Sequence, residues 1–424
     1  MEAKKNLWQR LGPGMLLAAT SVGASHLVLS PQAGALFGYS LLWLVLASHL
    51  FKYPAFEFGP RYAAATGQNL LQGYKKIRGP RGWALYMFLG STILQGIGVL
   101  AGVVSVSGCV ICTWTGLLDT EYFSVIIIGV VVALLFCGGF SWLDHLNKIM
   151  MATLALATFL AFVPVFPAPS SFAHLVIPSI PAGSIVLVAA ILGWMPTGID
   201  VSIWHSFWTL QKLERLGEKT RSGDLSQRKR QLKISLVDMR VGYGLSLLTG
   251  LMFITMGAVH LAGRGTELKG IQFAEAISSA YTNILGAWMY HVFMLTAFFA
   301  MFSTTYTVID GFSRSFSEAL AALRDSWARE SVRKWTYGGF VIFSALCAAV
   351  CVVWVGNPVT LVTTVALISL AVAPVLYALN LACVNRDITD PELRPATATV
   401  AIGWLGTAFM ILALAVTFYV KVIL

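Results

Sequence analysis

Charged side chains are scarce in this chain of 424 residues. Asp, Glu, Lys and Arg together make up only 11% of it, whereas hydrophobic residues make up 57%. A soluble protein of this length needs many more charges to cover its surface. The mean hydropathy of +0.75 instead reflects repeated apolar runs, each about 20 residues long, which is the length that crosses the hydrocarbon core of a bilayer. The composition excludes a soluble globular protein and predicts an integral membrane protein in contact with the lipid bilayer.

Motifs of catalytic and cofactor sites are also missing. The chain has no H-E-x-x-H, no phosphate-binding G-x-x-x-x-G-K-[ST] and no G-x-S-x-G, so we expect neither an enzyme nor a bound cofactor. Of the six cysteines, Cys109 and Cys112 form a C-x-x-C inside an apolar run without a second pair, which indicates no zinc or redox site. No cleavage site follows "MEAKKNLWQR", so we expect the first apolar segment to be retained. Residues 1–424 are predicted to form one transmembrane domain.

Eleven apolar segments are long enough to be transmembrane helices. Their predicted limits are 12–37, 40–62, 83–113, 122–140, 146–166, 184–208, 234–262, 283–309, 337–356, 359–384 and 398–421. Two are interrupted in the middle, the first by "SVGASH" and the sixth by "GWMPTGID". Proline lacks a backbone N–H, and glycine tolerates unwound dihedral angles. Backbone of this kind cannot face lipid, so it must be buried or line a polar cavity.

The two broken spans occupy corresponding places in two blocks of five spans, about 11–166 and 184–384, and the helix 398–421 is additional. Because five is odd, the second block starts on the opposite side of the membrane from the first. Inverted repeats with a substrate site between two discontinuous helices are typical of secondary transporters. We therefore predict an all-α polytopic transporter whose broken helices one and six meet at the substrate.

Positive charge is unevenly divided between the loops, although the formal net charge is +10. Lysine and arginine gather before the first span and after spans two, six and eight, with eight of them between Lys212 and Lys233. On the other side, Arg264 and Lys269 are exceptions in loops otherwise poor in cations. Cytoplasmic loops carry such an excess. The pattern thus needs no nucleic-acid partner, and it predicts a bacterial plasma membrane protein with its N-terminus in the cytoplasm and its C-terminus outside.

Residues 11–70 resemble a known transporter family. "LGPGMLLAAT", "QAGALFGYSLLWLVLASHL" and "AAATGQNL" are similar to the first two helices of the Nramp family of metal-ion transporters. Met195-Pro196 resembles the Met-Pro of that family's sixth helix, and His205-Ser206 its downstream His-Ser. The resemblance implies a LeuT-like fold, alternating access, and a divalent metal ion bound between helices one and six, usually with proton-coupled import.

The family's metal-binding residues are replaced in this chain. Family members have Asp-Pro-Gly-Asn at the break in helix one, where residues 23–26 read Gly-Ala-Ser-His, and the metal-binding carboxylate is gone. After the Met-Pro of helix six, Thr and Gly stand in place of His and Asn, and the third span lacks the acidic and arginine residues of the family's proton route. The substrate-binding residues predicted from the match are Gly23, Ala24, Ser25, His26, Met195, Pro196, Thr197, Gly198 and, in helix ten, Thr364.

Three side chains near the breaks are candidate metal ligands. His26 either ligates a transition metal or satisfies carbonyl groups of the unwound turn. Asp200 is either the relocated carboxylate or a residue that the helix dipole stabilises at the start of the second half of helix six. Together with Met195 they would favour softer divalent ions such as Mn, Fe or Zn.

Two other functions fit the same scaffold. Without the helix-one carboxylate, the exposed N–H groups of the half-helices can hold a small anion or a polar organic solute. A non-transporting membrane sensor or scaffold is the third reading. Glu57 and Arg61 are spaced to pair on one helix face, and Lys52 is expected to gate the inner vestibule or meet Asp238. The residues predicted for gating or an ion pathway are His49, Lys52, Glu57, Arg61, His205 and Asp238.

The orientation can be tested with reporter fusions. Alkaline phosphatase folds only outside the cytoplasm, so we expect it to be active when fused after Leu424 and inactive when inserted between residues 217 and 223. The opposite pair of activities would contradict the orientation.

Overall fold

The computed structural model describes residues 12–138, 140–216, 224–262 and 271–422, and the regular structure in these ranges is entirely helical. All eleven predicted spans correspond to a helix or to a pair of half-helices. The first is α2 (Pro13–Ser21), the π-helical turn η1 (Ser25–Leu29) and α3 (Ser30–Phe37), and the sixth is α10 (Ile185–Trp194) with α11 (Asp200–Arg215). The others are α4 (Leu42–Thr66), α6 (Trp83–Thr115), α7 (Thr120–Cys137), α8 (Phe140–Phe162), α12 (Leu225–His260), α14 (Met289–Leu323), α15 (Glu330–Val355), α16 (Pro358–Asp387) and α17 (Thr397–Val422). The predicted all-helical membrane fold is confirmed.

Some boundaries differ from those predicted. Helix α12 begins at Leu225 rather than near 234, because Asp224 caps it: its carboxylate accepts the Gln227 amide at 2.8 Å. That bond and one from the Ser226 hydroxyl lower the pKa of Asp224. Helix α14 continues to Leu323, beyond the predicted limit of 309. Short connecting helices that were not predicted are α5 (Leu70–Tyr74), α9 (Ala173–Val176) and α13 (Ile271–Leu285).

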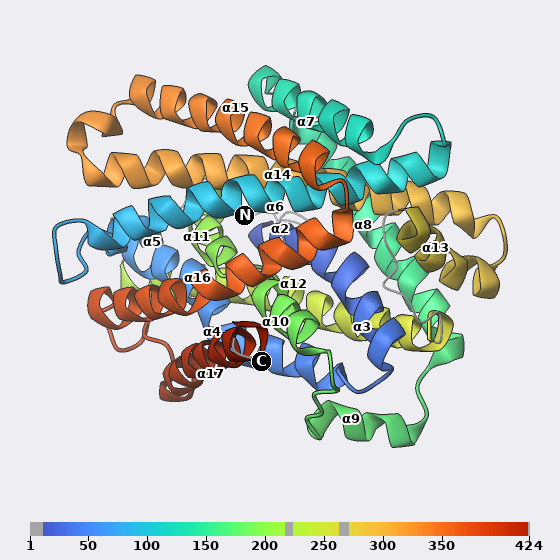
Figure 1. Ribbon diagram of the computed structural model, residues 1–424. Helices are drawn as coiled ribbons and strands as arrows, with labels where there is room; N and C mark the ends of the chain where they lie inside the picture. The colour runs from blue at the N-terminus through green and yellow to red at the C-terminus, as the bar shows by residue number, and fades with distance from the viewer. Residues whose placement is uncertain (1–11, 139, 217–223, 263–270, 423–424) are drawn as a thin grey trace, which may run out of the picture.

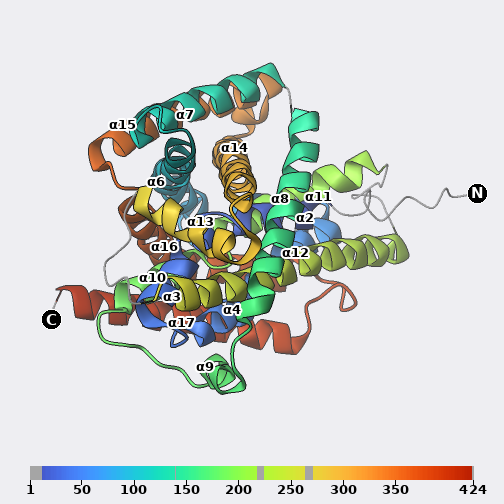
Figure 2. The same ribbon diagram turned by 90° about the vertical axis from the view of Figure 1, so that its right-hand side faces the viewer.

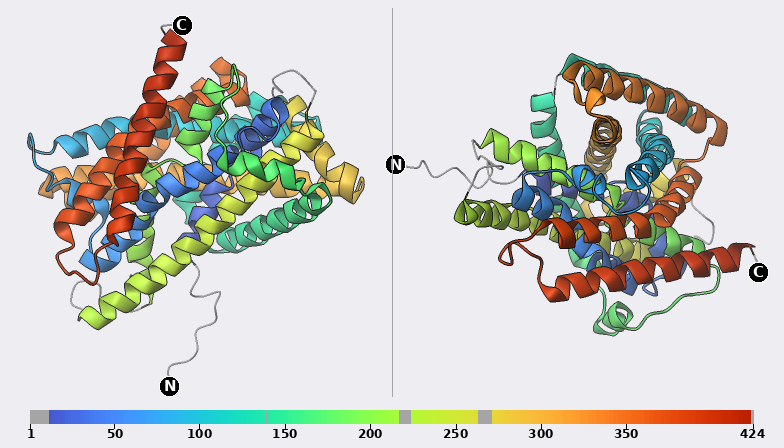
Figure 3. Two further views of the ribbon diagram at one scale, coloured as in Figure 1. Left: turned by 90° about the horizontal axis from the view of Figure 1, so that it is seen from below. Right: turned by 90° about the vertical axis from the view of Figure 1, so that its left-hand side faces the viewer.

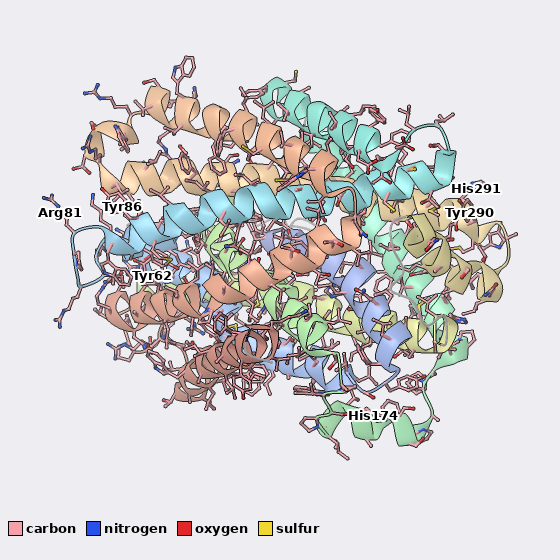
Figure 4. The ribbon with its side chains drawn as sticks, viewed as in Figure 1. Tyr62, Arg81, Tyr86, His174, Tyr290 and His291 are labelled. Carbon is pink, nitrogen blue, oxygen red and sulfur yellow. The ribbon has the colours of Figure 1, made fainter. Side chains whose placement is uncertain are left out.

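Long helices cross the molecule side by side. In Figure 1, α6 and α14 run between the left and right ends with α15 above them, and Figure 4 places Arg81 at the left end and His291 at the right. Helix α6 follows Arg81, whereas α14 starts at Met289, next to His291. The Trp114 indole near the end of α6 donates to His291 Nδ1 at 3.0 Å. Helices α6 and α14 are therefore antiparallel neighbours.

The outer helices show where lipid contacts the protein. Only 22%, 33% and 22% of the apolar windows of α7, α15 and α17 are buried, compared with 83% for the first span. Helices α7 and α15 lie on one side of the bundle and α17 on the other (Figures 2 and 3). Trp335 and Trp354 of α15 are 81% and 87% exposed. Their 19 positions of separation span about 28 Å, close to the ~30 Å hydrocarbon thickness, as expected for tryptophans at the two interfaces.

The broken helices lie inside this outer layer. Helix α12 packs against α2, α3 and α4, α10 packs against α16, and α14 packs against α6. Glycine lets α12 approach the first span closely: a Cβ on Gly242 would come 1.9 Å from the carbonyl oxygen of Gly14. The same helix carries Gly244, where a Cβ meets nothing within 4 Å.

These two glycines form a matched pair for a packing test. Gly242→Ala is expected to destabilise the protein by about 1–3 kcal/mol or more, because it forces α12 away from α2. Gly244→Ala is expected to be neutral or stabilising by up to about 1 kcal/mol, because alanine is the better helix former. Thermal unfolding of the purified variants measures both. Equal destabilisation would contradict the close approach.

Candidate functional site

The first helix unwinds at Val22 and Gly23, between α2 and the turn that begins at Ser25. The last helical bond of α2 runs from the Val22 amide to Ala18 O at 2.8 Å, and the chain re-enters helical geometry when Leu27 N bonds to Gly23 O at 2.9 Å. A Cβ on Gly23 would lie 3.3 Å from the Thr304 side chain of α14. Glycine at this position therefore leaves room for α14 to pack against the break.

The sixth span breaks over residues 195–199. Helix α10 ends when the Met195 amide bonds to Ile191 O at 2.7 Å, and Met195 itself is extended. Pro196 has no N–H to continue the helix. Lys52 of α4 reaches this break: its Nζ donates to Gly193 O at 3.0 Å and to Thr197 O at 3.3 Å. The lysine thus satisfies backbone carbonyls that the unwinding leaves without a helical partner.

A small cavity lies between the two breaks, with a volume of about 30 Å³, enough for about two water-sized ligands. Its lining includes four residues with a hydroxyl group and one with a carboxylate, Asp200, which is the first residue of α11. Its apolar wall comes from valine and tryptophan side chains. The lining residues are Thr20, Ala24, Ser25, Val99, Val103, Trp194, Thr197, Gly198, Asp200, Val201, Trp204, Thr304 and Val308. The arrangement suits a monatomic ion or a solute of a few atoms.

Gly198 makes room for the carboxylate. A Cβ at this position would come 2.4 Å from Oδ1 of Asp200. Asp200 is 5% exposed, and the N-terminus of α11 has no side-chain cap. The carboxylate therefore stands at the start of α11, where the dipole favours it.

His26 turns away from this cavity toward α12. Its Nε2 lies 2.9 Å from Ser246 O, and a carbonyl oxygen only accepts, so Nε2 carries the proton and donates. The neutral ring then accepts the Ser25 hydroxyl at Nδ1, 2.8 Å away. Both nitrogens are occupied by protein partners, which corresponds to the second role considered for His26, that of satisfying the unwound turn.

The predicted set of three metal ligands does not assemble. Met195 is completely buried and does not line the cavity, and His26 points to α12, so Asp200 is the only one of the three at the cavity. Among the described residues, no group of three His, Cys, Asp or Glu side chains is placed to hold a metal ion.

Thr364 is a further correction. It is exposed, whereas Val362 and Val365 of the same helix pack toward Gly102 and Gly98 of α6. Thr364 is two positions after Val362, which corresponds to a rotation of about 200° around the helix axis. Its side chain therefore faces away from α6. From α16 it is Ser369 that reaches helix six, where it accepts the Trp194 indole N–H at 3.0 Å. Of the other predicted binding residues, Ala24, Ser25, Thr197 and Gly198 line the cavity, whereas Gly23 and Pro196 do not.

One of the two expectations for Lys52, that it meets Asp238, is wrong. Asp238 instead links three elements near the end of helix six. Its carboxylate accepts the Gly12 amide at 3.2 Å, the Gly14 amide at 3.1 Å and the Lys212 ammonium at 3.0 Å. Gly14 lies in α2, Lys212 in α11 and Asp238 in α12. This group of contacts, the Asp238 cluster, holds both broken helices to α12.

The remaining gating candidates are distributed over separate contacts. Glu57 and Arg61 pair at 2.7 Å as predicted, and Arg61 also donates to Leu393 O at 2.7 Å, which ties α4 to the segment before α17. His49 Nδ1 donates to Val45 O at 2.8 Å, and its Nε2 lies 3.2 Å from the Ser246 hydroxyl. His205 is fully buried, and neither ring nitrogen has a hydrogen-bond partner among the described residues.

Several cavity residues were missed from the sequence. Thr20 precedes the first break, and Trp194 and Trp204 flank the second. Each lies only a few positions from a break, and this short distance along the chain was an available signal. Thr304 lies in the run Ser303–Thr305 of an otherwise apolar span, which was a second signal. Val99, Val103 and Val308 carry no such signal, because valine is common on every face of a membrane helix.

The Asp238 cluster yields a stability prediction. Asp238→Asn removes the negative partner of a buried ammonium and of two amides, so we expect it to lower the free energy of unfolding by about 3 kcal/mol. Asp325→Asn is the matched control, because Asp325 pairs with Lys75 at the surface, with a side chain 98% exposed, and such pairs contribute about 0–1 kcal/mol. Thermal unfolding compares the two. Equal midpoints for both variants would show that the cluster does not hold the helices.

Similarity to known proteins extends over almost the whole chain. A family model described as "Natural resistance-associated macrophage protein-like" (Nramp) matches residues 14–421. An uncharacterized protein of Pasteurella multocida is 28% identical over 403 residues, which are 91% of this chain and 88% of that protein. The divalent metal cation transporter MntH of Chromohalobacter salexigens is 26% identical over 277 residues, 60% of this chain and 58% of that protein.

Solved structures agree on the fold. A mutant of the manganese transporter of Eremococcus coleocola superposes with a TM-score of 0.74 at 14% identity, covering 99% of this chain and 88% of that one. Mhp1, a nucleobase-cation-symport-1 family transporter, superposes with a TM-score of 0.58 at 17% identity, covering 96% of this chain and 91% of that one. The LeuT-like fold with broken helices one and six is thereby confirmed. On the family match over residues 14–421, this chain belongs to the Nramp family.

Proposed function

We propose that the protein is a secondary transporter that moves a divalent metal ion across the membrane by alternating access. The observation that carries the proposal is the position of Asp200, a buried carboxylate at the break in helix six that faces the cavity between the two discontinuous helices. A carboxylate within a membrane bundle is costly and marks ion pathways. Membership of a family with metal-transporting relatives supports the choice of cargo.

The donor set of the cavity indicates which metals are suitable. The residues that line it include Asp200, Thr20, Ser25, Thr197 and Thr304, whose side chains carry oxygen, and neither the histidine nor the methionine of the predicted soft set. All-oxygen sites suit Mn²⁺ and Mg²⁺ better than softer ions. We therefore place Mn²⁺ and Mg²⁺ ahead of Zn²⁺ as cargo.

The membrane arrangement belongs to the same proposal. The distribution of lysine and arginine supports a plasma membrane protein with a cytoplasmic N-terminus and an external C-terminus. The breaks in spans one and six support two inverted five-helix repeats, about 11–166 and 184–384, with α17 as an addition. In this orientation the Asp238 cluster lies toward the cytoplasm, where it closes the inner end of the path.

A small anion or polar organic solute is the second candidate, and one specific observation favours it. The Lys52 ammonium is held by Gly193 O and Thr197 O of the same break that carries Asp200, so a divalent ion at the cavity would meet a positive charge as well as the carboxylate. Two tryptophans, Trp194 and Trp204, and four valines line the cavity beside the hydroxyl groups. Such a wall suits an uncharged or zwitterionic solute of a few heavy atoms.

Flux into proteoliposomes tests the metal function. We expect saturable Mn²⁺ uptake by the wild type and at least about a tenfold loss in Asp200→Asn, because a ligating charge is removed. Asp119→Asn is the matched control, since Asp119 is exposed and makes no cap at the start of α7. Equal Mn²⁺ uptake by Asp200→Asn and wild type would contradict the site.

A stability screen separates the alternatives. If no divalent ion moves, but a small anion or amino acid both stabilises the protein and is transported, the second candidate is correct. Stabilisation without any flux would identify a sensor.

A further inference from the structure

Lys52 is a buried lysine that the transport proposal leaves without a role. It lies in the middle of α4, is 1% exposed, and is not among the residues that line the cavity. An ammonium group inside a membrane bundle is costly unless it is paired. The atoms that surround it therefore indicate what the group does.

The partners of Lys52 are those of a free cation. Its Nζ has carbonyl oxygens of Gly193 and Thr197 at 3.0 and 3.3 Å. Gly193 O is at the C-terminal end of α10, where the helix dipole is negative. Rings of carbonyl oxygens replace the hydration shell of monovalent cations in ion-conducting proteins.

We propose that Gly193 O and Thr197 O form a monovalent-cation site at the break in helix six, and that the ammonium of Lys52 fills it as a tethered ion. The inference rests on the proposed transport function, because the site shares Thr197 with the substrate cavity. A tethered ion stays in place at any salt composition. Substrate binding in the wild type therefore requires neither sodium nor potassium.

A lysine that only fills space differs from a cation held by a site in one measurable respect. A space-filling lysine is replaced by any side chain of similar size, whereas a cation site vacated by its tethered ion accepts a free cation of the right shape. Alanine keeps Cβ, so Lys52→Ala removes three methylene groups and the ammonium, which are the atoms of n-propylammonium. This amine is the matched probe, and tetramethylammonium, which carries the charge without an N–H donor, is its control.

Thermal unfolding of the purified full-length chain tests the site directly. We expect n-propylammonium to raise the unfolding midpoint of Lys52→Ala by several degrees above the value in equimolar tetramethylammonium, as for any ligand that binds only the folded state. The wild type is expected to show no difference between the two salts. An equal response of Lys52→Ala to both salts would overturn the proposal.

Two further variants control for general effects of the amine. Lys52→Met fills the space with an uncharged chain, and Lys334→Ala removes a surface lysine paired with Glu330 at 2.8 Å. Neither is expected to respond to n-propylammonium, and a response of either would contradict a specific site.

A measurement on the wild type keeps the proposal testable if Lys52→Ala does not fold. Substrate affinity is expected to be equal in sodium, potassium and choline chloride, and a requirement for sodium or potassium would overturn the inference. The two proposals fail separately. Absence of metal flux in the wild type contradicts the transport function, whereas the amine response of Lys52→Ala is read without any flux.

Discussion

Unwound backbone inside a membrane must find its hydrogen-bond partners within the protein, and the interior of this molecule is organised around that requirement. At the break in helix six, Lys52 supplies donors to Gly193 O and Thr197 O. At the break in helix one, the Ser25 hydroxyl lies between Ser21 O, at 3.0 Å, and the His26 ring. Each break is thus stabilised by a polar side chain next to it, and the cavity lies between the two breaks.

The same requirement explains why His26 is not the substitute for the missing carboxylate. A histidine at an unwound turn can bind either the cargo or the backbone. Here a hydrogen-bond partner on α12 holds the His26 ring toward the scaffold. Ser246 offers both a carbonyl and a hydroxyl oxygen to Nε2, at 2.9 and 3.1 Å. The ring is therefore part of the scaffold, and the negative charge at the cavity comes from helix six alone.

The fold could be predicted from the sequence because its signals are local. Apolar runs, the two interruptions and the alternation of cationic loops each depend on a few neighbouring residues. The site could be predicted only in part, since facing directions depend on how helices rotate against one another. Asp200 lines the cavity as expected of a ligand, whereas Thr364, in a helix that packs on α6 through Val362 and Val365, faces outward. The pairing of Lys52 with helix six rather than with Asp238 depends on contacts 141 and 145 positions apart, which no spacing rule reveals.

We infer that the cargo binds between the two breaks, beside Asp200, and not at His26. Anomalous diffraction from crystals grown with Mn²⁺ locates the ion directly. We expect a peak in the cavity within coordination distance of the Asp200 carboxylate and of oxygen atoms of Thr20 or Thr197. A peak at the His26 ring, or an occupied metal site elsewhere in the bundle with the cavity empty, would contradict it.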